Sequence, residues 1–206
     1  MIAGALAAAV LSRNPKKNAR EDTRHYTSAF TIIELLVVIA IIIILAGLIL
    51  STVGYVQKKG ARSRAEAEIA AISAALESFK ADNGIYPRDA TDTDGLNPDA
   101  NIDLAAYSKA TLYLYKQLTG DANADRQITG TETGKSYFSF KPNQLSPFDQ
   151  TQVTAIRDPF GNSYGYSTAK ATNPAGTVGY NPTFDLWSTA GATSGAPIQT
   201  QWIKNW

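Results

Sequence analysis

The chain has 206 residues, a formal net charge of +1 at pH 7, no cysteine and a single histidine. Without cysteine there can be no disulfide framework, so packing or a metal must stabilise the fold. From residue 84 onward there are 9 basic and 11 acidic side chains, which excludes the basic surface of a nucleic-acid-binding domain.

Residues 1–29 have the composition of a leader segment. The first eleven are apolar and rich in alanine, and residues 12–29 carry five basic side chains against two acidic ones. Excess positive charge favours a cytoplasmic location for this end. Four cations between residues 58 and 64 lie on the other side of the apolar run that follows, so charge alone leaves the orientation open.

The most apolar stretch of the chain is Phe30–Leu50, FTIIELLVVIAIIIILAGLIL, with one acid, Glu34, near its start. No charged residue occurs from Leu35 to Val56, and a helix of these 22 residues is about 33 Å long, enough to cross a membrane core. Residues 30–57 are therefore predicted to form a transmembrane helix. A carboxylate is costly in such a segment, so Glu34 either has a partner or is an interfacial residue of an ordinary anchor.

Beyond the span, the helix is predicted to continue as an amphipathic segment over residues 58–83. Its apolar residues step by three and four and so share one face: Ala65, Ile69, Ile72, Leu76 and Phe79. Pairs at i and i+4, Arg62 with Glu66 and Arg64 with Glu68, are expected to support the other face. The helix should end at Gly84, a suitable C-cap, because Pro87 follows closely.

A globular domain is predicted over residues 84–206, with a variable loop region at 88–152. Residues 88–103 are polar and read as a surface loop, and residues 108–118 fit a short amphipathic helix. The next residues have the spacing of a twelve-residue calcium loop, with oxygen-bearing side chains at positions 1, 3, 5, 7, 9 and 12: Asp121, Asn123, Asp125, Gln127, Thr129 and Glu132.

Calcium prefers six to eight oxygen ligands, and three carboxylates with an amide, a carbonyl and a hydroxyl or water can supply them. We therefore predict Ca²⁺ as a cofactor. Two features oppose the prediction: Arg126 occupies the sixth position, where glycine usually makes the sharp turn, and the following segment looks like a strand. The alternative is a solvated turn rich in Asp and Asn.

From Ser136 onward the pattern is typical of β-structure. Residues 137–140 form a short aromatic run, residues 158–162 make a turn, Tyr164 and Tyr166 alternate with small residues, and residues 184–187 are expected to form the last strand. The fold class is thus predicted to be α+β, with a long helix followed by a small antiparallel β-sheet.

Four segments resemble a known family. Ala29-Phe-Thr-Ile-Ile-Glu34-Leu after a basic leader is similar to the cleavage and methylation signal of type IV pilins and type II secretion pseudopilins. DNGIYP (82–87), DPFGNSYGY (158–166) and FDLWSTAG (184–191) are similar to segments of the major pseudopilin, the G-type subunit. Ala29 departs from the glycine that usually precedes the cut.

The resemblance implies a lollipop fold, in which the outer half of the long helix packs on the sheet. It also implies cleavage between Ala29 and Phe30 by a prepilin peptidase, N-methylation of Phe30, and retention of Glu34 for assembly. The chain would then be an inner-membrane protein with a cytoplasmic leader and a periplasmic head. Its partners would be copies of itself in a helical filament, minor pseudopilins and the inner-membrane secretion platform.

Two other functions stay open at this point, a type IV pilin for adhesion, motility or DNA uptake, and a single-span anchored binding domain. An enzyme is not expected. The only histidine, His25, lies in the leader, and no serine has the sequence context of a nucleophile.

Overall fold

The longest element is the helix α1, Ile32–Asn83, in a computed structural model that describes residues 30–206 apart from 130, 131, 133 and 150. The leader, including Ala29, lies outside the described residues. The chain divides into two compact units, residues 1–47 and residues 48–206, so α1 contributes to both.

The first part of α1 is apolar and exposed. Its large hydrophobic side chains, from Ile32 to Leu50, have much of their surface accessible. α1 is the one described helix that is long and apolar enough to cross a membrane, and it begins near the N-terminus. These properties agree with the predicted span by length and composition.

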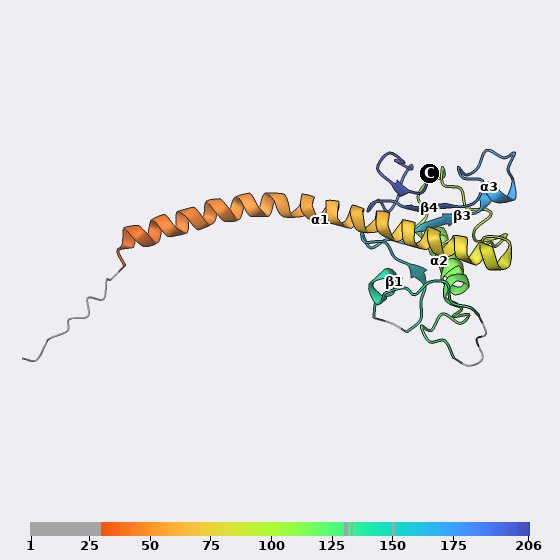
Figure 1. Ribbon diagram of the computed structural model, residues 1–206. Coiled ribbons are helices and arrows are strands. Elements are labelled where there is room, and N and C mark those ends of the chain that lie inside the picture. Colours follow the sequence, from red (N-terminus) through yellow and green to blue (C-terminus); the bar gives the residue numbers. More distant parts are fainter. Residues whose placement is uncertain (1–29, 130–131, 133, 150) are drawn as a thin grey trace, which may run out of the picture. The chain divides into compact units, whose positions relative to one another are not determined.

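The second part of α1 packs against the globular region of the second unit (Figure 1). The predicted stripe is confirmed, since Ala65, Ile69, Ile72, Leu76 and Phe79 are all buried in one hydrophobic core. The helix also ends where the sequence indicated. Gly84 adopts φ +80°, and its N–H donates to the carbonyl oxygen of Lys80 at 2.7 Å.

The second helix, α2 (Leu104–Thr119), is longer than the predicted 108–118. It begins four residues earlier because the Asp103 side chain accepts hydrogen bonds from the N–H groups of Ala105 and Ala106. It ends at Gly120, whose φ of +79° is left-handed. The buried face of α2 joins the same core as α1.

The strands form two small antiparallel sheets. A short 3₁₀ turn, η1 (Pro142–Gln144), leads into β1 (Leu145–Ser146), which pairs with β2 (Ala155–Ile156). The larger sheet has the order β3-β4-β5: β3 (Gly165–Ser167), β4 (Asp185–Ser188) and β5 (Ile203–Lys204), with the short helix α3 (Ala169–Thr172) after β3. The described chain is therefore α+β, as predicted.

Two predicted β features are wrong. Residues 137–140 are not a strand, because the N–H groups of Tyr137 and Phe138 both donate to the Leu118 carbonyl and the rings pack on other aromatic side chains. The last strand is β5, not the segment at 184–187, which contributes the central strand β4. The turn at 158–162 is confirmed, with Gly161 at φ +99°.

Polar contacts also join the second part of α1 to the globular region. Arg62 pairs with Glu66 at 3.4 Å, as predicted, and donates to the carbonyl oxygens of Gln201 and Trp202. The predicted Arg64–Glu68 pair does not form. Glu68 instead accepts a 2.7 Å hydrogen bond from the Tyr164 hydroxyl.

Candidate functional site

Glu34 and Thr31 form a reciprocal cap at the start of α1. One carboxylate oxygen of Glu34 accepts from the Thr31 N–H at 2.9 Å and from the Thr31 hydroxyl at 2.8 Å. In return, the Glu34 N–H donates to the Thr31 hydroxyl oxygen at 3.3 Å. This is a capping box, which satisfies N–H groups that a helix start otherwise leaves unpaired.

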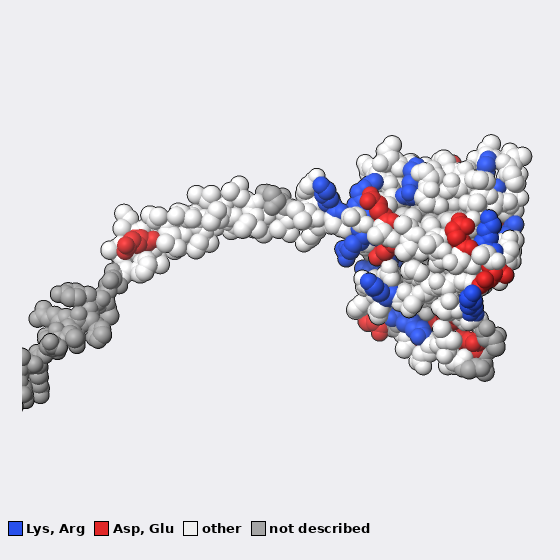
Figure 2. All heavy atoms as spheres, viewed as in Figure 1, with Lys and Arg blue, Asp and Glu red and all other residues white. Residues whose placement is uncertain are grey.

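The cap gives Glu34 a local role that the sequence interpretation missed. The signal was present, because Thr-x-x-Glu before an apolar run is the sequence pattern of a capping box. Phe30, the expected first residue after cleavage, is exposed next to this cap. Figure 2 shows the acidic side chain near the start of an otherwise uncharged stretch of α1.

The predicted calcium loop begins directly after α2, at a buried aspartate. Asp121 is 1% exposed, and its carboxylate accepts from the Tyr115 hydroxyl at 2.7 Å, from the Arg126 N–H at 2.8 Å and from the Asp125 N–H at 3.2 Å. Arg126 adopts φ +65°, a left-handed conformation. The sharp turn that glycine would make at the sixth position is therefore made by arginine.

The other predicted ligands lie along the same loop, and most of their side chains accept hydrogen bonds from backbone N–H groups. Asn123 accepts from the Asp125 N–H at 3.0 Å, and Asp125 accepts from the Gln127 N–H at 2.9 Å. Glu132 reaches back across the loop: one oxygen accepts from the Ala122 N–H at 3.0 Å and the other from the Thr129 N–H at 3.0 Å. Gln127 and Thr129 thus take part through their backbones.

These residues fit calcium only in part. The left-handed turn matches the loop type that the spacing predicts, but the carboxylates do not converge. Among the described residues, no group of three or more His, Cys, Asp or Glu side chains is placed to hold a metal ion. The acidic side chains stabilise the loop by accepting hydrogen bonds from its N–H groups, and Ca²⁺ would compete with these N–H groups for the carboxylates of Asp125 and Glu132.

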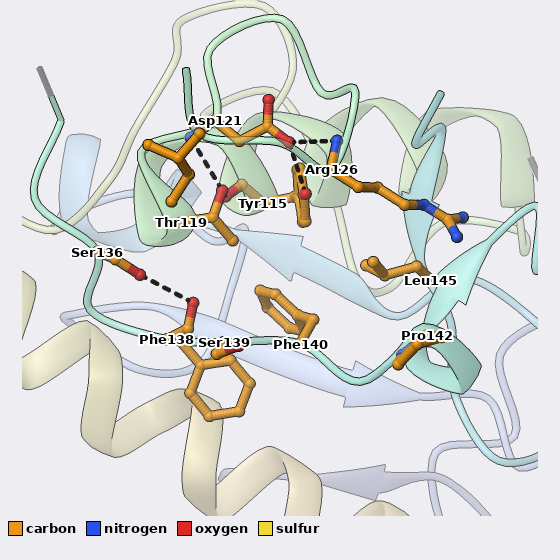
Figure 3. A pocket seen from close by; sticks show the side chains of 11 residues that line it. Tyr115, Thr119, Asp121, Arg126, Ser136, Phe138, Ser139, Phe140, Pro142 and Leu145 are labelled. Atoms are coloured by element: carbon orange, nitrogen blue, oxygen red, sulfur yellow. Dashed lines mark hydrogen bonds between the residues drawn. The ribbon is translucent and has the colours of Figure 1, made fainter. Parts of the chain in front are cut away.

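A pocket of about 240 Å³ lies next to this loop. Figure 3 shows Asp121 between the Tyr115 hydroxyl and the Arg126 N–H, above the rings of Phe138 and Phe140. Burial and the hydrogen bond to Asp121 raise the pKa of Tyr115 above its ordinary value, so this phenol remains a donor. The hydrogen bond between Tyr115 and Asp121 therefore links the loop to the aromatic side chains that line the pocket.

Arg126 also lines this pocket. Its guanidinium donates to the carbonyl oxygens of Pro147 and Phe148, while its buried Nε has no hydrogen-bond partner among the residues that the structure describes.

Comparisons with protein families, with curated proteins and with solved structures gave no match.

Proposed function

We propose that this chain is a structural subunit of a type II secretion pseudopilus. The observation that carries the proposal is Glu34, the only acidic residue from 30 to 65, at the start of an exposed apolar helix. A prepilin peptidase would cut between Ala29 and Phe30 and leave the subunit in the inner membrane. The leader would be cytoplasmic and the head periplasmic.

The chemistry of assembly follows from the two charges at the new N-terminus. Cleavage would create an ammonium group at Phe30, four residues before the Glu34 carboxylate. An unpaired charge in an apolar environment is costly, whereas a paired one is tolerated. Glu34 of one copy meeting the ammonium of the next would fix the axial register, and apolar packing of α1 would supply most of the attraction. Minor pseudopilins and the secretion platform are the further partners.

One observation favours a simpler function. Because Glu34 already caps its own helix, the acid can be explained without any second subunit. The chain would then be a single-span anchor carrying a globular binding domain. The two functions differ in what they require of residue 34: assembly needs its negative charge, whereas capping needs only a hydrogen-bond acceptor.

Two variants separate these requirements. Glu34→Gln keeps an acceptor that can complete a capping box but has no charge. Thr31→Ala removes both hydroxyl contacts of the capping box, keeps the backbone N–H bond of residue 31 to Glu34 and keeps the charge. Each variant, with the unmodified chain, would be co-expressed with a prepilin peptidase and the secretion platform, and the fibres would be counted by electron microscopy.

The pseudopilus proposal expects fibres from the Thr31→Ala chain and a severe loss of fibres from the Glu34→Gln chain, with both proteins still in the membrane. Normal fibres from Glu34→Gln would refute the charge-pairing role. Intact-mass measurement of the unmodified chain should show removal of 29 residues and a new N-terminus at Phe30. A chain that keeps Met1 under these conditions would support the simple anchor.

A further inference from the structure

Four cations follow the uncharged stretch of α1 within seven residues. Lys58, Lys59, Arg62 and Arg64 are all exposed, and they are the only charged residues between 35 and 65. Figure 2 shows Lys and Arg side chains gathered along α1 where it joins the globular part of the second unit. We call residues 58–64 the basic segment.

Three of these cations have no counter-ion among the residues that the structure describes. Arg62 is engaged by Glu66 and by two backbone carbonyls. Lys58, Lys59 and Arg64 make no hydrogen bond or ion pair with any residue that the structure describes. Glu68, the acid expected to pair with Arg64, accepts from Tyr164 instead. An anion that pairs with these three side chains would therefore come from outside the described residues.

The position of the basic segment along α1 indicates which anion. At about 1.5 Å per residue, Lys58 lies about 3 Å and Arg64 about 12 Å beyond Val56, the end of the uncharged stretch. Headgroups add roughly 5–7 Å to each side of the hydrocarbon core, and charges act over about 8 Å at physiological salt. Tyr55, which is 70% exposed, is the residue type that favours the membrane–water interface.

We infer that the basic segment binds the phosphodiester headgroups of anionic phospholipids. The inference rests on the proposed membrane-anchored state, and it adds a lipid partner that holds the base of the head against the membrane before assembly. Lysine offers a point charge and arginine a planar fork, and both bind phosphate oxygens. Each cation near an anionic surface shifts such an equilibrium by about fivefold.

The absence of cysteine allows a direct test in the full chain. Gly60 lies inside the basic segment, and a Cβ placed there would have no atom within 4 Å, so Gly60→Cys gives a single site for a nitroxide label. The labelled chain would be reconstituted, one copy per nanodisc, in phosphatidylcholine alone or with phosphatidylglycerol. The measured quantity is the collision rate of the label with a water-soluble relaxation reagent.

Phosphatidylglycerol should lower the collision rate several-fold, and high salt should restore it. Replacing Lys58, Lys59 and Arg64 by glutamine should abolish the lipid effect, whereas the charge-matched replacement of Lys109, Lys116 and Lys141 should preserve it. Equal collision rates in the two lipids would overturn the inference. It would also be overturned by an effect that appears only when a nanodisc holds two copies, because that result would indicate binding to an acidic surface on the neighbouring copy. Failure of the chain to insert into either nanodisc would count against the membrane-anchored subunit itself.

Discussion

The Tyr164 hydroxyl donates a 2.7 Å hydrogen bond to the Glu68 carboxylate and so joins the residue before β3 to α1. Tyr164 is fully buried, and burial together with Glu68 raises its pKa well above the ordinary value for tyrosine. The phenol therefore stays protonated and remains a donor at any physiological pH. Docking of α1 thus includes this directional contact in addition to the apolar stripe and the Arg62 hydrogen bonds to Gln201 and Trp202.

Removing this hydroxyl should weaken the attachment of α1. We expect Tyr164→Phe to lower the free energy of unfolding by about 1–2 kcal/mol, because a hydrogen bond to a charged acceptor is lost while the ring keeps its packing. The melting temperature of the detergent-solubilised chain, followed by near-ultraviolet circular dichroism, should fall by several degrees.

Glu66→Gln is the matched control for this contact, since Glu66 lies two residues from Glu68 and its ion pair with Arg62 is exposed. Exposed pairs contribute little, so this variant should stay within about 0.5 kcal/mol of the unmodified chain. Equal losses of stability from Tyr164→Phe and Glu66→Gln would mean that the Tyr164–Glu68 hydrogen bond contributes no more than an exposed ion pair.

The pH dependence of stability should include a contribution from Asp158, which lies in the turn before β3. Its carboxylate accepts from the N–H groups of Phe160 and Asn162 and from the Ser188 hydroxyl, yet burial raises its pKa above 3.8. The native state therefore binds this proton more tightly than the unfolded chain. The stability that it contributes is present below pH 3.8 and is lost as pH rises through the native pKa.

Asp158→Asn should accordingly be as stable as the unmodified chain at neutral pH, or more stable, and its stability should fall less as pH rises from acid to neutral. Asparagine can still accept both N–H bonds, and no charge is desolvated. The measurement is the free energy of unfolding by denaturant across this pH range. A large loss of stability at neutral pH would show that the charge itself holds the turn.

Asp94 offers a comparison of opposite sign. Burial opposes its ionisation, but hydrogen bonding by Thr168 and Thr172 and the 2.7 Å ion pair with Arg88 outweigh burial, so its pKa is lowered below 3.8. Its contribution is present above pH 3.8 and is lost as pH falls through the native pKa. Asp94→Asn should destabilise the chain at neutral pH, and the difference should vanish in strong acid.

Local sequence patterns correctly predicted the features of α1 that depend only on residues in or next to the helix. The steps of three and four from Ala65 to Phe79 identified the buried face, and Gly84 with Pro87 identified the end of the helix. The start of α2 was missed because its length depends on a cap by Asp103, which had been placed in a loop. The Thr31–Glu34 cap could also be predicted from the Thr-x-x-Glu spacing before an apolar run.

Contacts between residues far apart in the chain could not be predicted from the sequence. β5 has only two residues, and it exists because Trp187 and Ser188 of β4 offer it a pairing edge. Arg64 lies one helical turn from Glu68, yet Glu68 accepts a hydrogen bond from Tyr164, 96 positions later in the chain. In the predicted calcium loop, spacing identified the oxygen-bearing residues but gave no indication that their carboxylates would accept hydrogen bonds from backbone N–H groups.

We propose that the 121–132 loop nevertheless binds Ca²⁺, with Asp125 and Glu132 among its ligands. Calcium should then raise the melting temperature of the chain, because a ligand that binds only the folded state stabilises it, by about 2.7 kcal/mol at a hundredfold excess over Kd. Asp125→Asn combined with Glu132→Gln should remove the rise. Both substitutions leave the buried Asp121 and its hydrogen bond from Tyr115 intact.

The control for calcium removes two charges elsewhere, through Asp149→Asn and Glu66→Gln, both at exposed positions. This variant should keep the calcium response. Magnesium should give a smaller shift, since it prefers six ligands in strict octahedral geometry. An unmodified chain whose melting temperature does not change with millimolar calcium would reduce the loop to the N–H-bonded turn already described.

The contact between β3 and β4 should be intolerant of any side chain at Gly165. A Cβ there would lie 2.0 Å from the Trp187 ring, which is completely buried and cannot move away. Gly165→Ala should therefore destabilise the chain by about 3 kcal/mol or more, at the upper end of the cost of overpacking.

Gly60→Ala is the opposite case. A Cβ added at this helical position would meet no other part of the chain within 4 Å, so alanine should stabilise α1 by about 0.5–1 kcal/mol. Denaturant unfolding of the two variants should give shifts of opposite sign, and a tolerated alanine at position 165 would mean that Trp187 does not lie flat against the β3 backbone.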